Sequence, residues 1–449
     1  MGYAQYKELN GSGVSWLQKK PSHWRIKRLK FSTDLINNKV SVEESPLPYL
    51  GLEHIESWTG RKIDGEIKNS EGLASSFVAG DVLFGKLRPY LAKVHLAQHD
   101  GLISSEALVV RSKDELHAEF LKYYMLSRDF INIVDSSTYG SKMPRASWDF
   151  IGNLPVLLPE VEEQQIIARF LDFKTAQFDA LIAKQRILLE KLAEKRTALI
   201  SHAVTKGLDR SVPMKDSGLA WLGEIPAHWK RMLMIRVIFK FEQGWSPSCD
   251  EREASLDEWG VLKSGCVNYG VFQEHEHKTL PPSIDPIPSL EVKAGDILMC
   301  RASGSKHLIG SVAAVRKCRS KLIFSDKTYR IALQPDIIDP EFFVLLMKSK
   351  YLRDQIELSI SGADGLANNI PQSSVKGYQI VLPPSIGEQK TISTLLNKKI
   401  ESIEAQEVKI LEVIGRLQEY RAALITNTVT GKIDVRGFRI PQPVEGITS

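Results

Sequence analysis

Two long stretches of the chain place apolar or long side chains alternately three and four residues apart. The first runs from Val161 to Val204 without proline or glycine, and the second matches it at an offset of 225 positions. This spacing is the a/d pattern of a coiled-coil seam, and it predicts two long helices, each roughly 66 Å long at ~1.5 Å per residue. The predicted seam residues are Ile167, Leu171, Lys174, Phe178, Leu181, Gln185, Leu188, Leu192, Lys195 and Leu199, then Ile392, Leu396, Lys399, Ile403, Gln406, Ile410, Val413, Leu417, Tyr420 and Leu424.

A polar residue interrupts each predicted seam at a different level. Gln185 corresponds to Ile410 in the other helix, and Gln406 corresponds to Leu181. One polar seam residue can fix helix register and partner choice at some cost in stability. An alternative stays open, in which each helix packs only on its own globular domain. The length of the helices favours pairing, because each would extend beyond the face of such a domain.

The helices belong to a repeat of about half the chain. Four segments return in the same order, and this indicates a duplicated domain. Two equivalent units in one chain tend to be related by a pseudo-two-fold axis, which would make the two helices antiparallel. The matched segments are Pro21-Ser22-His23-Trp24 with Pro226-Ala227-His228-Trp229, Ala79–Leu83 with Ala294–Leu298, Glu163-Gln164 with Glu388-Gln389, and Arg196–Ile200 with Arg421–Ile425.

Two further expectations follow from the repeat. The tryptophans at its start are expected to be core or packing residues rather than stacking platforms: Trp16, Trp24, Trp221 and Trp229. The C-terminal tail after Asp434 aligns with the linker after Asp209, so the tail is expected to end near the first Pro-Ser-His-Trp segment.

Composition narrows the class of protein. The chain has 449 residues and 43 % hydrophobic residues, without an apolar run near the ~20 residues of a membrane span. Its first residues lack the basic and apolar regions of a secretory signal. Cys249, Cys266, Cys300 and Cys318 are isolated, which argues against a zinc site or a disulfide framework and favours the cytoplasm.

Charge and motifs point to binding rather than catalysis. The net charge is +5 and is spread so evenly that it gives only a faint indication of nucleic acid. The sequence contains no phosphate-binding G-x-x-x-x-G-K-[ST] loop, no H-E-x-x-H zinc motif and no G-x-S-x-G nucleophile elbow. We therefore expect no catalytic centre and no metal site.

Polar loops that follow predicted strands are the candidate binding surface. A strand followed by a Gly-containing loop with Arg, Lys and Ser can place side chains against phosphates and base edges. The side chains of these loops differ between the two copies. Because Arg suits guanine and Asn or Gln suits adenine, the two copies would prefer different bases. For any single residue, a solvated turn remains the alternative. The candidates are Lys86, Arg88, Tyr90, Lys93, Ser105, Lys142 and Arg145 in the first copy, and Arg301, Ser303, Ser305, Lys306, Lys327, Asn368, Asn369 and Gln372 in the second.

The ordered, duplicated motifs resemble those of the DNA-specificity (S) subunit of type I restriction–modification enzymes, over nearly the whole chain. The resemblance implies an α+β fold with two globular mixed α/β target-recognition domains. Two long helices that form an antiparallel coiled coil would join them with pseudo-two-fold symmetry. The expected segments are target-recognition domain 1 at 1–159, a spacer helix at 160–207, domain 2 at 208–384, a second helix at 385–433 and a tail at 434–449.

The resemblance also implies how such a chain acts. Each domain would recognise one half of a bipartite, asymmetric site in double-stranded DNA, and the helices would set the distance between the halves. Two methyltransferase (modification) subunits and the restriction (endonuclease and translocase) subunits would be its partners. No cofactor is expected on this chain, whereas S-adenosylmethionine, ATP and Mg²⁺ are expected on the partners.

The hypothesis is therefore a non-catalytic DNA-recognition subunit that directs adenine methylation and restriction. One rival is a two-domain coiled-coil adaptor that binds proteins, which predicts DNA affinity without sequence preference. A second rival is an autonomous DNA-binding regulator, which would bind its site tightly without methyltransferase partners. The remaining rival is that the chain is itself an enzyme, but its sequence shows no residues that could carry out the chemistry.

Overall fold

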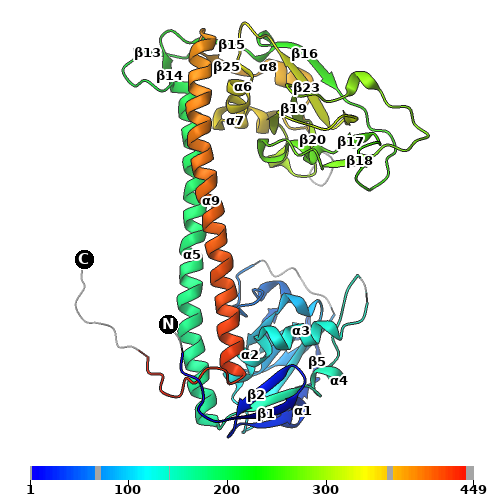
Figure 1. The fold of residues 1–449 in the computed structure, drawn as a ribbon, viewed down its shortest axis with the longest axis vertical. Helices are drawn as coiled ribbons and strands as arrows, with labels where there is room; N and C mark the ends of the chain where they lie inside the picture. The colour runs from blue at the N-terminus through cyan, green and yellow to red at the C-terminus, as the bar shows by residue number, and fades with distance from the viewer. Residues whose placement is uncertain (1–2, 66–71, 141, 362–367, 441–449) are drawn as a thin grey trace. The chain divides into compact units, whose positions relative to one another are not determined.

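The computed structural model of the chain describes residues 3–65, 72–140, 142–361 and 368–440. It divides into two compact units (Figure 1). Unit 1 holds Met1–Arg186 and Leu411–Ser449, and unit 2 holds Ile187–Ile410. Both units are mixed α/β, with small, mostly antiparallel sheets and helices packed around them.

Unit 1 is built on two four-stranded sheets. The first has the order β4-β11-β8-β9 and is antiparallel throughout. The second has the order β5-β7-β10-β6, and its β10 and β6 are parallel. Two-stranded pairs β1-β2 and β3-β12 complete the strands. The bounds are β1 Leu9–Val14, β2 Leu17–Pro21, β3 Arg25–Arg28, β4 Thr33–Ile36, β5 Lys39–Ser41, β6 Tyr49–Leu50, β7 Leu73–Phe77, β8 Val82–Gly85, β9 Val94–Leu96, β10 Gly101–Ser104, β11 Ala107–Ser112 and β12 Pro155–Leu158.

Unit 2 repeats this plan. Its antiparallel sheet β16-β23-β19-β21 has the strand order of β4-β11-β8-β9, and its parallel pair β17-β22 answers β6-β10. The bounds are β13 Met214–Asp216, β14 Glu224–Pro226, β15 Lys230–Leu233, β16 Ile238–Gln243, β17 Gly260–Leu262, β18 His277–Thr279, β19 Ile297–Cys300, β20 Ala302–Ser303, β21 Val312–Ala314, β22 Leu322–Phe324, β23 Thr328–Leu333, β24 Asn368–Asn369 and β25 Gln379–Leu382.

Short helices pack on the sheets of each unit. In unit 1 these are α1 Leu29–Ser32, α2 Ala118–Leu126, α3 Arg128–Ser136 and α4 Trp148–Ile151, with 3₁₀ turns η1 Leu52–His54 and η2 Pro89–Leu91. In unit 2 they are α6 Pro340–Met347, α7 Lys350–Ser359 and α8 Gln372–Gly377, with η3 Met234–Arg236, η4 Ser264–Gly270, η5 Pro288–Leu290 and η6 Lys306–Leu308.

The duplicated tryptophans occupy different environments. Trp24 and Trp229 are 1 % and 0 % exposed and belong to the main core of their units. Trp16 is partly buried against the core of unit 1. Trp221 is 51 % exposed and is therefore a packing residue rather than a core residue. It lies between β13 and β14, and its ring stacks on that of Tyr351 at 5.7 Å between ring centroids.

The duplicated His-Trp and Glu-Gln motifs contact each other in both units. In unit 1, Glu163 Oε2 lies 2.8 Å from His23 Nε2, and Glu163 Oε1 accepts a hydrogen bond from Tyr6 at 2.7 Å. In unit 2, Glu388 pairs with His228 at 3.0 Å and accepts the indole N–H of Trp229 at 3.0 Å. These motifs therefore attach the start of each repeat to the start of its long helix.

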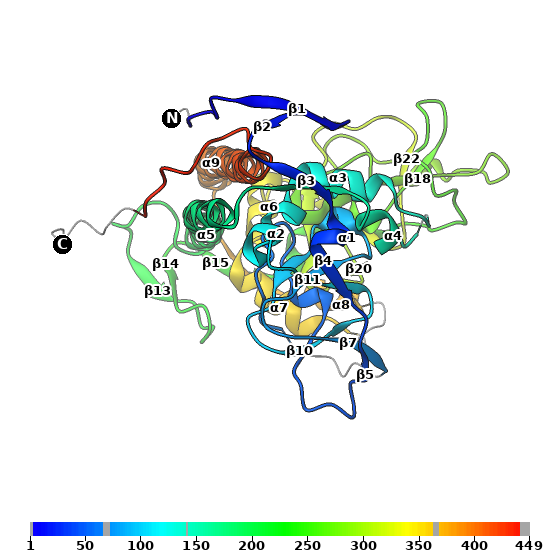
Figure 2. The ribbon, with the colours of Figure 1, turned by 90° about the horizontal axis from the view of Figure 1, so that it is seen from below.

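The two long helices are α5, Val161–Lys206, and α9, Ile386–Val429. They lie side by side within each unit (Figures 1 and 2). In unit 1, Arg421 of α9 donates to Asp179 of α5 at 3.0 Å. In unit 2, Arg196 of α5 donates to Glu407 of α9 at 3.1 Å. The first half of α5 thus pairs with the second half of α9 in unit 1, and the reverse holds in unit 2.

The buried face of the helices corrects half of the predicted seam. Every second predicted position is right, but the positions between them are displaced by one residue. Leu181 and Leu188 are each 45 % exposed, while the neighbouring Ile182 is buried and Leu189 half-buried. At each displaced position the observed seam residue is the one directly after the predicted residue. The observed residues are Thr175, Ile182, Leu189, Arg196, Ile400, Glu407, Ile414 and Arg421, in place of Lys174, Leu181, Leu188, Lys195, Lys399, Gln406, Val413 and Tyr420.

The displacement has a physical reason. Both choices give the same three-four spacing and both contain charged or polar residues, so spacing and residue type do not distinguish them. The ion pairs of Arg196, Glu407 and Arg421 mark the observed seam. Gln406 is exposed and does not interrupt the seam, so that prediction was wrong. Gln185 keeps its predicted seam position and is half-buried.

The segment after α9 returns to the N-terminal residues of unit 1. Asp434 donates its backbone N–H to Ala4 at 2.8 Å, and Arg436 lies over the ring of Tyr6. The last residues of the tail, 441–449, lie outside the described part of the chain. Within that part, none of the helices is both long and apolar enough to span a bilayer.

Candidate functional site

Two matched sets of backbone hydrogen bonds hold together the segments that carry the candidate residues. Most of these segments are loops, as predicted, but Ser303, Asn368 and Asn369 lie in the short strands β20 and β24, and Gln372 begins α8. In unit 1, Lys86 N–H donates to Glu106 O at 2.9 Å, and Lys86 O accepts from Ala146 at 3.0 Å. In unit 2, Arg301 N–H donates to Lys327 O at 2.8 Å, and Arg301 O accepts from Ile370 at 3.0 Å. We name these segments loop site 1 (85–93, 104–106 and 138–146, without 141) and loop site 2 (301–306, 325–327 and 368–372).

The matched bonds define equivalent positions in the two copies. Lys86 corresponds to Arg301, and Glu106 corresponds to Lys327. Because Ala146 and Ile370 occupy the same place in the two bond sets, the residues before them, Arg145 and Asn369, are equivalent as well. The backbone is thus repeated while the side chains on it differ in charge and hydrogen-bonding pattern.

Loop site 1 brings together several predicted residues at the end of β8. The backbone of Arg88 has a positive φ of 51° and its N–H donates to Pro144 O at 2.8 Å, which joins the loop after β8 to the loop before α4. The side chains of Arg88, Tyr90, Ser105 and Lys142 are exposed, and Lys86 is half-buried. Lys93 is directed elsewhere: its Nζ donates to Leu52 O at 2.5 Å, and burial lowers its pKa.

A single carboxylate organises the charges of loop site 1. Glu106 accepts two hydrogen bonds from Arg145, Nε to Oε2 at 2.9 Å and Nη2 to Oε1 at 3.1 Å. These bonds, aided by the nearby charges of Lys86 and Lys39, hold the pKa of Glu106 below its usual value. Burial and the charge of Lys86 lower the pKa of Lys39. Three cations therefore surround one carboxylate at this surface.

Loop site 2 has a different arrangement at the equivalent positions. Arg301 is held by the protein, since its Nε donates to the Tyr329 hydroxyl at 3.0 Å and its Nη1 donates to Asp326 O at 3.2 Å. Lys327 and Lys306 are exposed, and Ser305 is half-buried. Ser303 accepts the backbone N–H of Ser305 through its Oγ at 3.2 Å.

The amide candidates of loop site 2 differ in accessibility. β20 pairs with β24 in the register Ala302 to Asn369 and Ser303 to Asn368. Asn368 is only 3 % exposed, and its Oδ1 has no hydrogen-bond partner among the residues that the structure describes. Asn369 and Gln372 are half-buried, so their side chains reach the surface. Asn368 would contact a ligand only after a local rearrangement.

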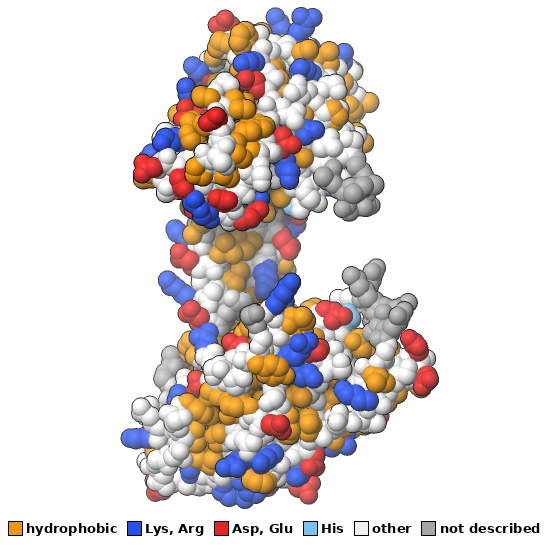
Figure 3. Space-filling view, turned by 90° about the vertical axis from the view of Figure 1, so that its right-hand side faces the viewer, with side chains coloured by type: hydrophobic (Ala, Val, Ile, Leu, Met, Phe, Trp, Pro, Cys, Tyr) orange, Lys and Arg blue, Asp and Glu red, His pale blue; other side chains and the backbone are white. Residues whose placement is uncertain are grey.

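Charge on the molecular surface is mixed. On the face that Figure 3 shows, Lys and Arg side chains are interspersed with Asp and Glu rather than gathered into one patch. Such a surface favours local, side-chain-specific contacts over a broad electrostatic footprint.

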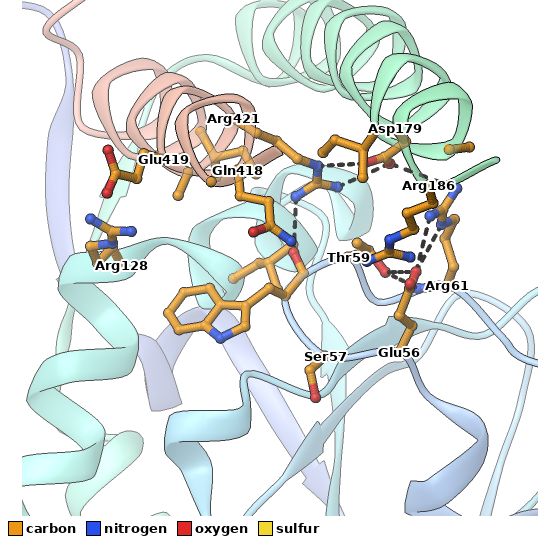
Figure 4. A pocket seen from close by; sticks show the side chains of 17 residues that line it. Glu56, Ser57, Thr59, Arg61, Arg128, Asp179, Arg186, Gln418, Glu419 and Arg421 are labelled. Atoms are coloured by element: carbon orange, nitrogen blue, oxygen red, sulfur yellow. Dashed lines mark hydrogen bonds and ion pairs between the residues drawn. The ribbon is translucent and has the colours of Figure 1, made fainter. Parts of the chain in front are cut away.

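A cavity of about 500 Å³ lies in unit 1 beside α5 and α9 (Figure 4). Arg421, 6 % exposed, donates to Asp179 Oδ1 at 3.0 Å and to the backbone carbonyl of Trp58 at 2.9 Å. Trp58 has a φ of 65°, in the left-handed region that bulky residues rarely adopt. The guanidinium of Arg421 thus fixes a strained loop on the long helices, which is a structural role.

The described residues contain no group of three or more His, Cys, Asp or Glu side chains that could hold a metal ion. Burial raises the pKa of the Cys266 thiol to about 12 and that of Cys300 to about 11. Neither thiol is therefore a nucleophile at neutral pH.

Three residues in or beside the loop sites were not predicted to take part in them. Lys39 comes from β5, far from the other loops in sequence. Tyr329 lies inside a strand and looks like a core residue. Glu106 was not among the predicted candidates, but it carried a signal, because it occupies the position in the repeat of the predicted candidate Lys327.

Comparison with known proteins agrees with the resemblance of the motifs. Residues 48–191 match the family model described as type I restriction modification DNA specificity domain. The chain is 35 % identical to the EcoEI specificity subunit of Escherichia coli over 46 % of this chain, a match that spans 35 % of that relative. It is 23 % identical to the MjaVIII specificity subunit of Methanocaldococcus jannaschii over 96 % of this chain and 97 % of that relative.

A solved structure shares the fold. A chain from a study of complex assembly and conformational transition of the type I R-M system aligns with a TM-score of 0.67. The alignment covers 92 % of this chain and 99 % of that chain at 16 % identity, so the likeness concerns the fold alone.

Proposed function

We infer that this chain belongs to the DNA-specificity subunits of type I restriction–modification enzymes and recognises DNA by sequence. It is not itself an enzyme. We propose further that it recognises a bipartite, asymmetric site in double-stranded DNA, with unit 1 and unit 2 each contacting one half through its loop site.

The observation that carries this proposal is the repeated backbone with unlike side chains. Both loop sites hold three loops together by the same hydrogen bonds, yet one presents Lys86, Glu106 and Arg145 where the other presents Arg301, Lys327 and Asn369. A duplicated backbone that carries unlike side chains at the same positions is suited to recognise two different half-sites. Base edges in the major groove differ in hydrogen-bond pattern, so unlike side chains select unlike bases.

The long helices would set the distance between the half-sites. We propose that α5 and α9 form an antiparallel coiled coil that joins two target-recognition domains, 1–159 and 208–384, with pseudo-two-fold symmetry. The ion pairs Asp179–Arg421 and Arg196–Glu404 support this symmetry, because both members of one pair correspond to members of the other at the offset of 225.

The partners follow from the family. Two methyltransferase subunits would bind S-adenosylmethionine and modify adenine, and restriction subunits would use ATP and Mg²⁺. This chain would bind none of these cofactors and would act in the cytoplasm, where its DNA lies. Because the chain has a net charge of only +5, its partners would supply much of the affinity for DNA.

Reconstitution tests the function. The purified chain, mixed with the methyltransferase subunit of its host, should direct adenine methylation to one bipartite site. The methyltransferase without this chain should show no site preference. Methylation that is unaffected by omitting the chain would contradict the proposal. DNA binding without sequence preference would favour the adaptor, and tight specific binding by the chain alone would favour an autonomous regulator.

A change in helix length tests the spacer. Inserting about four residues in the middle of one long helix should change the spacer or abolish methylation, with both half-site sequences unchanged. The insertion should be placed in α5 in one variant and in α9 in another. A changed half-site sequence would show that the helices take part in base recognition instead.

A further inference from the structure

Loop site 1 contains an arginine whose side chain is already fixed before any ligand binds. Arg145 uses its Nε and Nη2 atoms to bind both oxygens of Glu106, at 2.9 and 3.1 Å. Its side chain is 34 % exposed and that of Glu106 is 29 % exposed, so the pair lies at the surface. Two N–H donors face the carboxylate, and no hydrogen bond from a described residue occupies the Nη1–Nη2 edge of the guanidinium.

The backbone of Arg145 is fixed as well. Its N–H donates to Tyr139 O at 3.1 Å, and its carbonyl accepts from Tyr139 at 3.3 Å. The next residue, Ala146, donates to Lys86 O at 3.0 Å. Both the main chain and the side chain of Arg145 are therefore ordered, which lowers the entropy cost of using it in binding.

The pair suits a base edge better than a phosphate. The Arg145–Glu106 pair itself carries no net charge, so the attraction of loop site 1 to a phosphate comes from Lys86 and Lys39 rather than from Arg145. The guanidinium edge instead matches the N7 and O6 acceptors of guanine in the major groove. Carboxylate oxygens have further lone pairs, and the N4 amino group of the paired cytosine is the donor next to guanine O6.

On this geometry we propose that Arg145, held in place by Glu106, recognises the guanine of one G·C pair in the half-site of unit 1. This inference rests on the proposed function and adds a specificity-determining residue to it. Arg145 contacts the base, and Glu106 is a positioning residue. The equivalent residues of unit 2, Asn369 and Lys327, lack this fork and select a different base pair there.

Other cations of loop site 1 are not prepared in the same way. Within the described part of the chain, the structure pairs neither Arg88 nor Lys142 with a carboxylate, and both are exposed. The ammonium group of Lys86 is a compact charge without a fork. These side chains suit the DNA backbone, whereas Arg145 suits one base.

The test selects bound duplexes from a randomised DNA library, with the chain co-purified with the methyltransferase subunit of its host. The wild-type chain should select a bipartite motif with an invariant G·C pair in one half. Arg145→Ala and Arg145→Lys should relax that one position and keep the rest of the motif. Glu106→Gln should relax it partly, because the fork loses its charged partner.

Affinity then measures the contact. Replacing the G·C pair by A·T should weaken binding of the wild-type chain about 10- to 100-fold and that of Arg145→Ala by less than about threefold. Replacing only guanine by 7-deazaguanine, which lacks the N7 acceptor, should weaken the wild type but not Arg145→Ala. The effect of 7-deazaguanine on the wild-type chain does not depend on the folding of any variant. Circular dichroism verifies that the variants fold.

A matched ion pair serves as control. Arg252 binds Glu258 through two hydrogen bonds of 2.7 and 2.6 Å in unit 2. Arg252→Ala should leave the half-site of unit 1 unchanged. An unchanged motif in Arg145→Ala overturns the inference while the wild-type motif still supports the proposed function. A wild-type chain that selects no motif overturns the proposed function itself.

Discussion

Gln164 offers a sharp test of how each repeat is attached to its long helix. The residue is completely buried in the first turn of α5. Its Nε2 donates to Glu115 O and Pro159 O, both at 2.9 Å, and its Oε1 accepts from His117 N–H at 2.8 Å. Gln389 makes the same three contacts in unit 2, with Ile337, Pro383 and Asp339. The variant Gln164→Glu keeps the size and replaces the amide group, which has two N–H donors, with a carboxyl group.

The magnitude follows from the two carbonyls that the new carboxyl would face. The folded protein must keep this carboxyl protonated, which at pH 7 costs about 3.7 kcal/mol for a group with an ordinary pKa of ~4.3. A protonated carboxyl donates only one hydrogen bond, and the lost second bond adds about 1 kcal/mol. The sum is about 4–5 kcal/mol, or a fall in Tm of about 10 °C or more for a unit of this size.

The stability of Gln164→Glu should depend on pH. The folded state holds a proton that the unfolded state releases, so the pKa is raised on folding. The variant therefore loses stability relative to wild type as pH rises above ~4.3 toward the folded-state pKa. At pH 5 the protonation cost falls to about 1 kcal/mol. Calorimetry at pH 5 and pH 7, with hydrogen exchange of the α2 and α5 amides, measures both effects.

Gln165→Glu is the matched control, because the next residue is exposed in the same helical turn. It should change the Tm by less than about 2 °C, since an acidic residue is favourable there. The reasoning is refuted if Gln164→Glu and Gln165→Glu behave alike, or if the loss in Gln164→Glu is the same at both pH values.

Three further predictions concern the helices and the thiols. Arg421→Met should destabilise unit 1 by about 3–5 kcal/mol, because it leaves the nearly buried Asp179 without its main partner. The equivalent Arg196→Met, at a site 33 % exposed, should cost less than about 1 kcal/mol. Equal losses of stability in thermal unfolding would contradict this difference. Ile414→Ala should lower the free energy of unfolding by about 2–4 kcal/mol, because Ile414 is buried in the seam. Val413→Ala, at 43 % exposure, should lower it by less than about 1 kcal/mol. The reverse order in denaturant titrations would favour the seam predicted from the sequence. Iodoacetamide at pH 8 should label Cys249 and Cys318 in the folded chain and all four cysteines in guanidinium, because Cys266 and Cys300 are buried; equal labelling of Cys266 in the folded chain, measured by mass spectrometry, would show that the site opens.

The sequence predicted the parts of the fold that repeat. Ordered matches located the duplication, and the absence of proline and glycine located the long helices. The His-Trp and Glu-Gln motifs were recognised as repeated features, and the structure explains them as partners of each other. The exact seam could not be derived, because an ion pair such as Arg196–Glu407 and an apolar contact occupy equivalent seam positions.

The candidate sites were predicted as loops but not as contacts. Arg145 and Asn369 were named from their residue types, while their equivalence follows from backbone hydrogen bonds between segments far apart in sequence. Lys93 and Asn368 fit the composition of a binding loop, yet the fold turns one toward Leu52 and buries the other. Glu106 depends on a partner 39 residues away. Side-chain direction and pairing are set by tertiary packing, which local patterns do not contain.

The central claim is that this chain directs adenine methylation to a bipartite DNA site. The most direct measurement maps methylated adenines across the host genome, in the wild type and in a strain that lacks this chain. The account predicts one motif of two specific halves separated by a spacer of fixed length, fully modified in the wild type and unmodified in the deletion strain. A motif that persists in the deletion strain, or a chain-dependent motif with a single uninterrupted half, would contradict the account.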